Sequence, residues 1–211
     1  MDTRLNLERF PRSVSFWFVV VGGCLVIGIY IAFTGVSIGM FPEPFSPMFN
    51  WMSDLGNVMY NPGGAIFFNL GCVLTSVVLV VFFMGYSYWN LMSRNKNLLL
   101  VTCKAFGFFD AFTLAMLGIF NENMVAMHDL FSVMFFYGNM GFMIVTSITL
   151  LFHSRSLKGV SLYGFLVAGV SMAFLVMPLA PRVIEWVIVI ASLGFVALMV
   201  VNTIFSVNKI T

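Results

Sequence analysis

Residues 63–86 read GGAIFFNLGCVLTSVVLVVFFMGY, a run without a single acidic or basic side chain. A helix needs roughly 20 apolar residues to cross a bilayer, so this run is long enough for one crossing. Its hydrophobic residues are continuous and do not alternate with polar ones, which favours an α-helix over a barrel strand. The stretch therefore predicts a transmembrane helix, and the fold depends on how often such runs return.

Comparable apolar runs occur along the whole chain. Of its 211 residues, 61% are hydrophobic and 9% are charged, whereas a soluble domain carries about 25% charged residues. Lipid must therefore cover most of the protein surface. We expect one transmembrane domain over residues 1–211, an all-α bundle of six membrane-spanning helices at Ser15–Ile38, Gly63–Tyr86, Leu98–Phe120, Met127–Phe152, Val160–Leu179 and Val183–Phe205.

The orientation of these spans follows from the basic residues, because Lys and Arg are enriched in cytoplasmic connections. Nine of the ten lie on the side that holds both termini, and Arg182 lies alone on the other side. The pattern predicts a multi-pass protein of the cell membrane with its N- and C-termini in the cytoplasm. The nine are Arg4, Arg9, Arg12, Arg94, Lys96, Lys104, Arg155, Lys158 and Lys209.

The first expected outer connection ends in the polar stretch WMSDLGNVMYNPGGAIFFN, residues 51–69. Asn61 and Pro62 are typical of a helix start, and Asp54 suits the cap of a short turn. Asn69 lies about two turns inside the following helix, where an amide needs a partner. Turn chemistry does not require both Asp54 and Asn69, so we expect them to contribute to a binding site.

The second expected outer connection and the helix after it carry Glu122, Asn123, His128 and Asp129. A carboxylate beside an imidazole is the usual material of acid–base chemistry, so Asp54, Glu122 and His128 are the candidate catalytic residues. Substrate binding is expected from Asp54, Asn69, Asn123, His128 and Asp129. Two structural interpretations stay open: an interfacial histidine, and an Asp129 placed to complement the helix dipole.

The remaining acidic residues and the two histidines limit which metal and haem sites are possible. Glu43 and Glu185 fit solvated loop residues as well as site residues. His128 and His153 lie 25 residues apart in one expected helix, about 37 Å along its axis, so they could not both ligate one haem iron. One histidine among scattered acids lacks the spacing of a known metal site. We predict no metal site, and the residues identify no cofactor.

Two polar residues, Asp110 and Asn139, fall near the middle of the third and fourth spans. A charge at that depth is costly, and an intramembrane acid is a functional hypothesis by default. One interpretation is a hydrogen-bonded pin between two helices. The other is a polar cavity or proton path that reaches down from the outer face.

Two motifs carry a resemblance to a known family. The first joins Ser53-Asp54-Leu55-Gly56, Asn61-Pro62 and Phe68-Asn69-Leu70-Gly71, and the second joins Gly118, Phe120, Glu122 and His128. The chain resembles an uncharacterised six-helix membrane family of archaea and bacteria, domain of unknown function nine-nine-eight. It is similar, more distantly, to eukaryotic autophagy-modulator and GPI-lipid-remodelling membrane proteins. The resemblance implies the six-helix fold and draws attention to Asp54, Asn69, Glu122 and His128.

Three functions are compatible with these features. The first is a polar site that opens to the extracytoplasmic leaflet and binds or processes a lipid or isoprenoid-like molecule. The second is a non-catalytic accessory or scaffold subunit of a larger membrane complex, and the third, weaker one is a small transporter that uses Asp110. The expected partners are membrane lipids and, under the second hypothesis, other membrane subunits. A net charge of +2 without a basic cluster gives no indication of a nucleic-acid partner.

Overall fold

A computed structural model describes residues 11–90, 94–177 and 181–207. It holds six long helices, α1 to α6, and two short 3₁₀ helices, η1 and η2, and no strand is present in these described ranges. All six long helices have the length and apolar composition to cross a membrane. The elements are α1 Arg12–Gly39, η1 Ser53–Gly56, α2 Ala65–Met84, η2 Gly85–Trp89, α3 Arg94–Ile119, α4 Val125–Phe152, α5 Lys158–Val176 and α6 Arg182–Val207.

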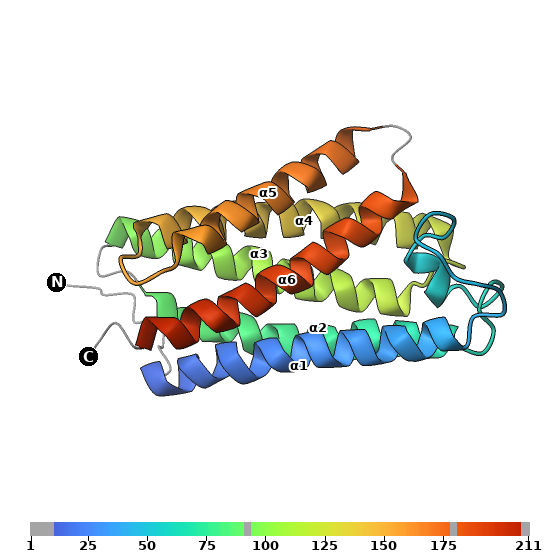
Figure 1. The fold of residues 1–211 in the computed structure, drawn as a ribbon, viewed down its shortest axis with the longest axis horizontal. Helices are drawn as coiled ribbons and strands as arrows, with labels where there is room; N and C mark the ends of the chain where they lie inside the picture. The colour runs from blue at the N-terminus through green and yellow to red at the C-terminus, as the bar shows by residue number, and fades with distance from the viewer. Residues whose placement is uncertain (1–10, 91–93, 178–180, 208–211) are drawn as a thin grey trace.

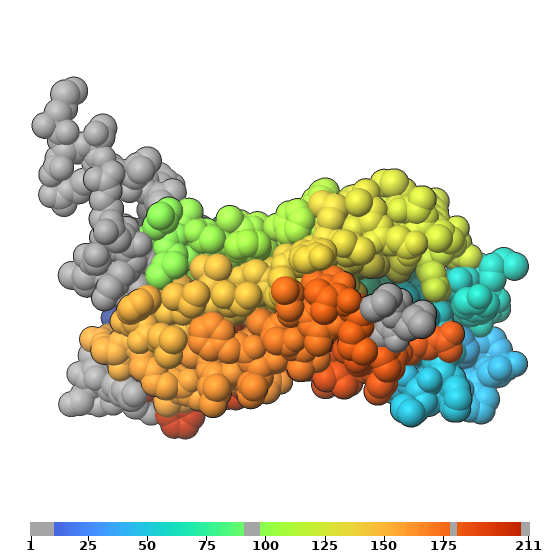
Figure 2. All heavy atoms as spheres, turned by 90° about the horizontal axis from the view of Figure 1, so that it is seen from above, coloured from blue at the N-terminus to red at the C-terminus, as the bar shows by residue number. Residues whose placement is uncertain are grey.

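The helices form a ring in which neighbours along the chain are neighbours in space (Figure 1). Each helix packs against the next, and α6 packs back against α1. Residues 40–64 and the α3–α4 connection lie at one end of the bundle, which we call the distal end, whereas the start of α1 and the end of α6 lie at the opposite, proximal end. In the space-filling view, α4 and α5 lie side by side along one face (Figure 2).

The all-α, six-helix architecture predicted from the apolar runs is confirmed, and the helix bounds differ only at their ends. The second helix begins at Ala65, two residues after the expected Gly63, because residues 61–64 form a turn. Asn61 still acts as a cap there, since its Oδ1 accepts the Gly64 N–H at 3.1 Å. The expected end of the fifth span, Leu179, lies outside the described residues.

Small residues set how closely the first two helices approach. A Cβ on Gly22 would meet the backbone of Phe82 at 3.2 Å, and one on Gly85 would meet the backbone nitrogen of Val19 at 2.6 Å. Glycine at both places therefore allows the backbones of α1 and α2–η2 to pack in contact, as small residues do in membrane helix pairs.

Aromatic side chains fill the centre of the ring in its proximal half. Phe142 of α4 lies 5.0 Å from Phe83 and 5.6 Å from Tyr86, measured between ring centroids, and 6.1 Å from Phe195 of α6. We call Phe83, Tyr86, Phe142 and Phe195 the aromatic floor. The interior of the ring above this floor, toward the distal end, is not fully filled, and this is where the candidate site lies.

Candidate functional site

The connection between α1 and α2, residues 40–64, forms a lid over the distal end of the ring, and we call it the distal lid. On one side it is held by α6. The buried Met52 donates its backbone N–H to Glu185 Oε2 at 2.9 Å, and Trp186 Nε1 donates to the Asn50 carbonyl at 3.1 Å. Arg182 also donates to the carbonyl of Phe49. These contacts tie the lid to the first turn of α6.

On its other side the distal lid is held by the α3–α4 connection. Asn57 Nδ2 donates to Glu122 Oε2 at 3.1 Å, and Asn123 Nδ2 donates to Asn57 Oδ1 at 2.9 Å. Asn123 Oδ1 in turn accepts the backbone N–H of Val58 at 2.8 Å. Residues far apart in the sequence thus form one amide network that fixes the lid in place.

Asp54, Asn61 and Asn69 order the lid itself. Asp54 Oδ2 accepts the Trp51 backbone N–H at 2.9 Å, next to η1. The amide of Asn61 is fully buried and donates to the carbonyl oxygens of Ser37 and Leu55. Asn69 Nδ2 donates to the Gly56 carbonyl at 3.0 Å, which supplies the partner that an amide inside a membrane helix requires.

Glu122 lies close to two other acids. Partial burial, together with the negative charges of Asp54 and Asp129, raises the pKa of its carboxyl to about 7, although the hydrogen bond from Asn57 acts in the opposite direction. Glu122 therefore takes up and releases a proton near neutral pH while it holds the lid. A carboxyl with this pKa is suited to proton exchange at the distal end.

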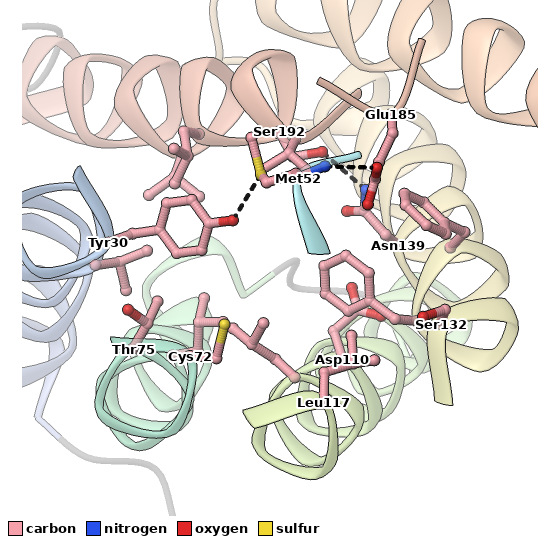
Figure 3. Close-up of a pocket in the computed structure, with 18 of the residues that line it drawn as sticks. Tyr30, Met52, Cys72, Thr75, Asp110, Leu117, Ser132, Asn139, Glu185 and Ser192 are labelled. Atoms are coloured by element: carbon pink, nitrogen blue, oxygen red, sulfur yellow. Dashed lines mark hydrogen bonds between the residues drawn. The ribbon is translucent and has the colours of Figure 1, made fainter. Parts of the chain in front are cut away.

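Beneath the distal lid is a cavity of about 110 Å³, counted as the space that the centre of a water molecule can occupy. One water needs roughly 10–15 Å³ on this measure, so the cavity has room for several waters or for part of an apolar chain. Side chains of α1, α2, α3, α4, α6 and the lid line it, and no described residue of α5 does. Figure 3 shows a close-up of this cavity, with lining residues drawn as sticks.

The cavity is elongated along the helices. Its lining on α2 runs from Phe68 to Phe83 and on α4 from His128 to Met143. Each pair is fifteen residues apart, about 22 Å at 1.5 Å per residue. Phe83 and Phe142 of the aromatic floor close its proximal end. The wall between lid and floor is mostly apolar.

Three polar residues meet near the proximal end of the cavity: Asp110 of α3, Asn139 of α4 and Ser192 of α6. Asn139 Nδ2 donates to Ser192 Oγ at 2.8 Å, which joins α4 to α6. Asp110 is 4% exposed, and its Oδ1 has no hydrogen-bond partner among the described residues. The carboxylate lies against Gly138, where any Cβ would collide with Oδ1.

His128 and Ser132 line the cavity from the same face of α4, as their four-residue spacing predicts. His128 Nδ1 lies 3.0 Å from the Phe120 carbonyl oxygen. A carbonyl can only accept, so Nδ1 carries the proton and Nε2 is left as an acceptor. In a neutral imidazole held in this way, Nε2 could accept a hydrogen bond from a bound molecule.

The structure places the predicted site residues in two groups. Asp54, Asn69, Glu122 and Asn123 belong to the lid and its attachments, whereas His128, Asp110 and Asn139 line the cavity. No hydrogen bond links His128 to Asp54, Asn69 or Glu122 among the described residues. Asp129 is exposed, in the first turns of α4, and does not line the cavity.

Of two further cavity residues, Tyr30 escaped the sequence reasoning, and Glu185 was left open between a loop residue and a site residue. Tyr30 donates its hydroxyl to Met52 Sδ at 3.0 Å, and Glu185 lines the cavity while it accepts from the lid. A helical repeat carried the signal for Glu185, because Val189, Ser192 and Val196 follow it at spacings of four, seven and eleven residues. Nothing in the pattern around Tyr30 points to the lid.

Possible metal ligands are dispersed over the described part of the chain. There, no three His, Cys, Asp or Glu side chains gather in a way that would hold a metal ion.

Comparison with known proteins gives one match. A family model described as "Protein of unknown function (DUF998)" matches residues 16–207, which includes all six long helices almost entirely. No curated protein and no solved structure matches the chain.

Proposed function

The chain belongs to the DUF998 family of proteins of unknown function, and we propose that it binds a lipid or isoprenoid-like molecule within its helix bundle, at a polar site that opens to the extracytoplasmic leaflet. The observation that carries this proposal is the elongated cavity between the distal lid and the aromatic floor. Ligand pockets of proteins combine an apolar wall with a few placed polar groups, and this cavity has that composition.

The length of the cavity favours a chain-like molecule. Its lining extends about 22 Å along α2 and α4 at 1.5 Å per residue. One leaflet of a bilayer has a hydrocarbon thickness of roughly 15 Å, half of the whole core. A lipid tail or an isoprenoid chain thus has the length and apolarity to lie along Phe68, Cys72 and Leu117.

The polar groups near the lid would position the other end of such a molecule. Glu185 and His128 lie at the distal end of the lining, with Ser53 of the lid and Ser132 of α4. Among them, His128 Nε2 is an acceptor. The resemblance of the Ser53-Asp54 motif and of His128 to GPI-lipid-remodelling membrane proteins supports a lipid by analogy.

The extracytoplasmic placement rests on the charges at the two ends of the bundle. The distal end holds the acids Glu43, Asp54, Glu122, Asp129 and Glu185, with Arg182, whereas Arg12, Arg155 and Lys158 lie at the proximal end. Basic residues favour the cytoplasmic side, so the proximal end would face the cytoplasm and the lid would face outward.

Two neighbouring residues of α6 provide a matched test. Val189 lines the cavity, whereas Ile190 is 59% exposed on the outside of the bundle. Val189→Phe would fill the cavity, and Ile190→Phe would add the same volume on the outer surface. Native mass spectrometry of both variants and the wild type, released from their own membranes, measures the bound lipids. We expect wild type and Ile190→Phe to carry the same small apolar adducts and Val189→Phe to lose them.

An identical set of adducts on all three proteins would refute the proposal, provided that Val189→Phe remains folded by circular dichroism. If the wild type instead carries no adduct and migrates in gentle detergent as part of a larger assembly, the role of accessory subunit replaces lipid binding.

A further inference from the structure

The proposed function leaves one feature of the cavity unexplained, the carboxyl of Asp110. A carboxyl in the middle of a membrane bundle is costly unless another group satisfies it. Asp110 Oδ1 is buried and has no hydrogen-bond partner among the described residues, although the side chain lines the cavity. The nearby amide of Asn139 donates to Ser192 instead. Asp110 thus lines the cavity with a carboxyl whose Oδ1 packs against Gly138 of α4 and receives no hydrogen bond from a described neighbouring residue.

The depth of Asp110 is set by its packing against Gly138, which places it level with Asn139 on α4. Asn139 follows His128 by eleven residues, about 16 Å along the helix. Along the cavity, polar groups therefore occur at the lid end and again just above the aromatic floor, with Leu114, Leu117 and Phe136 among the apolar residues between them.

The ionisable side chains of the cavity lining include the acids Asp110 and Glu185 and the histidine His128, and no Lys or Arg of the described residues lines it. A phosphate or carboxylate placed beside Asp110 would lie against another acid and find no Lys or Arg partner there, which is unfavourable at low dielectric. Neutral hydroxyl groups are available as well, since Thr75 Oγ1 is buried in the lining and has no hydrogen-bond partner in the described ranges.

We infer that the molecule bound in the cavity is an amphiphile with an alcohol or amine group at its deep end, and that this group donates a hydrogen bond to Asp110. The inference rests on the proposed function and specifies its ligand class: a long apolar body, no negative charge, and a donor that reaches the level of Asn139. In Figure 3, Asp110, Thr75 and Asn139 surround the space that this group would occupy.

Three probes of one chain length separate the possibilities: a saturated primary alcohol, the matching amine and the matching carboxylic acid. Their dissociation constants are measured at neutral pH on the purified full-length protein in nanodiscs, by native mass spectrometry. We expect the alcohol and the amine to bind about tenfold or more tightly than the acid, because each of them can donate a hydrogen bond to Asp110 whereas the ionised acid cannot.

Two near-isosteric substitutions test where in the cavity the polar group of the bound molecule lies. Asp110→Asn should weaken binding of the amine by about tenfold and remove the discrimination against the acid. Glu43→Gln, at an exposed lid residue that does not line the cavity, is the control and should leave the amine's affinity unchanged. Glu185→Gln, at the lid end of the cavity, should weaken binding of the amine less than Asp110→Asn does. If Glu185→Gln has the larger effect, the polar group lies under the lid and the inference is wrong.

The comparison of probes on the wild type does not depend on whether a variant folds. Equal affinities for alcohol, amine and acid would overturn the inference while leaving the proposed lipid site intact. If none of the three probes binds, and Val189→Phe likewise carries the same adducts as the wild type, the proposed function itself fails.

Discussion

Asn123 on the α3–α4 connection donates a hydrogen bond to Asn57 of the distal lid, with 2.9 Å between Nδ2 and Oδ1. The same Asn123 accepts the Val58 backbone N–H at 2.8 Å. One exposed side chain therefore holds the lid through both of its polar atoms. Because Met52 and Ser53 of the lid line the cavity, this contact connects the position of a surface loop to the interior of the bundle.

Asn123→Ala removes both hydrogen bonds and should loosen the lid more than it destabilises the bundle. We expect the free energy of unfolding to fall by about 1–2 kcal/mol, the usual contribution of two such bonds. Amide hydrogen exchange at Val58 should become faster, because that N–H loses its partner. Met124→Ala, a change at the next and exposed residue, is the control. Unchanged protection of Val58 in Asn123→Ala would contradict the role assigned to the network.

The raised pKa of Glu122 predicts how stability depends on pH. Its folded-state pKa of about 7 exceeds the ordinary value of 4.5, so the folded protein holds this proton more tightly than the unfolded chain. The contribution to stability is full below pH 4.5 and is lost as pH rises through about 7. Glu122→Gln keeps an acceptor for the Asn57 amide, and it should remove this loss of stability at high pH because glutamine does not titrate.

The measurement is the melting temperature of wild type and Glu122→Gln from pH 4 to pH 9. The difference between the curves isolates this one carboxyl, and Gln should become the more stable form above pH 7. Glu43→Gln, at an exposed lid residue, should follow the wild type throughout. Parallel curves for wild type and Glu122→Gln would show that the carboxyl is not perturbed.

From the sequence alone, Glu185 and Glu43 could each be a solvated loop residue. In the structure their surroundings differ. Glu185 accepts the backbone N–H of the buried Met52, whereas Glu43 is exposed. Glu185→Ala leaves a buried donor unsatisfied and should lower the free energy of unfolding by about 1–3 kcal/mol. Glu43→Ala should change it by less than about 0.5 kcal/mol. Denaturation in mixed detergent micelles measures both, and equal small effects would exclude a structural role for Glu185.

The fold was predictable because the bilayer imposes a simple rule on sequence. Residues 63–86 contain no charge, and only a helix can carry such a run across lipid. The four-residue spacing of His128 and Ser132 likewise places them on one helix face, and both line the cavity. Helix ends were less certain, since the turn at Asn61 resembles the helix start that follows it.

The site was predictable only in part, because hydrogen-bond partners depend on which helices meet. For Asp110 and Asn139 the sequence left open a hydrogen-bonded pin between two helices or a polar cavity. Asn139 donates to Ser192 of α6, a partner that follows from the closure of the ring. Asn57 and Asn123 are polar loop residues whose pairing across 66 positions has no local signal. The position of the distal lid in the folded protein therefore determines which polar residues line the cavity and which ones hydrogen-bond to the lid.

The packing of Asp110 against Gly138 leads to the last prediction. A Cβ at residue 138 would collide with Asp110 Oδ1, whereas nothing lies within 4 Å of a Cβ at Gly169 of α5. Gly138→Ala should lower the free energy of unfolding by about 1–3 kcal/mol, as overpacking does, and Gly169→Ala should not lower it, because alanine favours a helix over glycine. Denaturation of both variants in the same detergent gives the comparison. If Gly138→Ala is as stable as Gly169→Ala, the carboxyl does not lie against α4, and the depth assigned to the deep polar group is wrong.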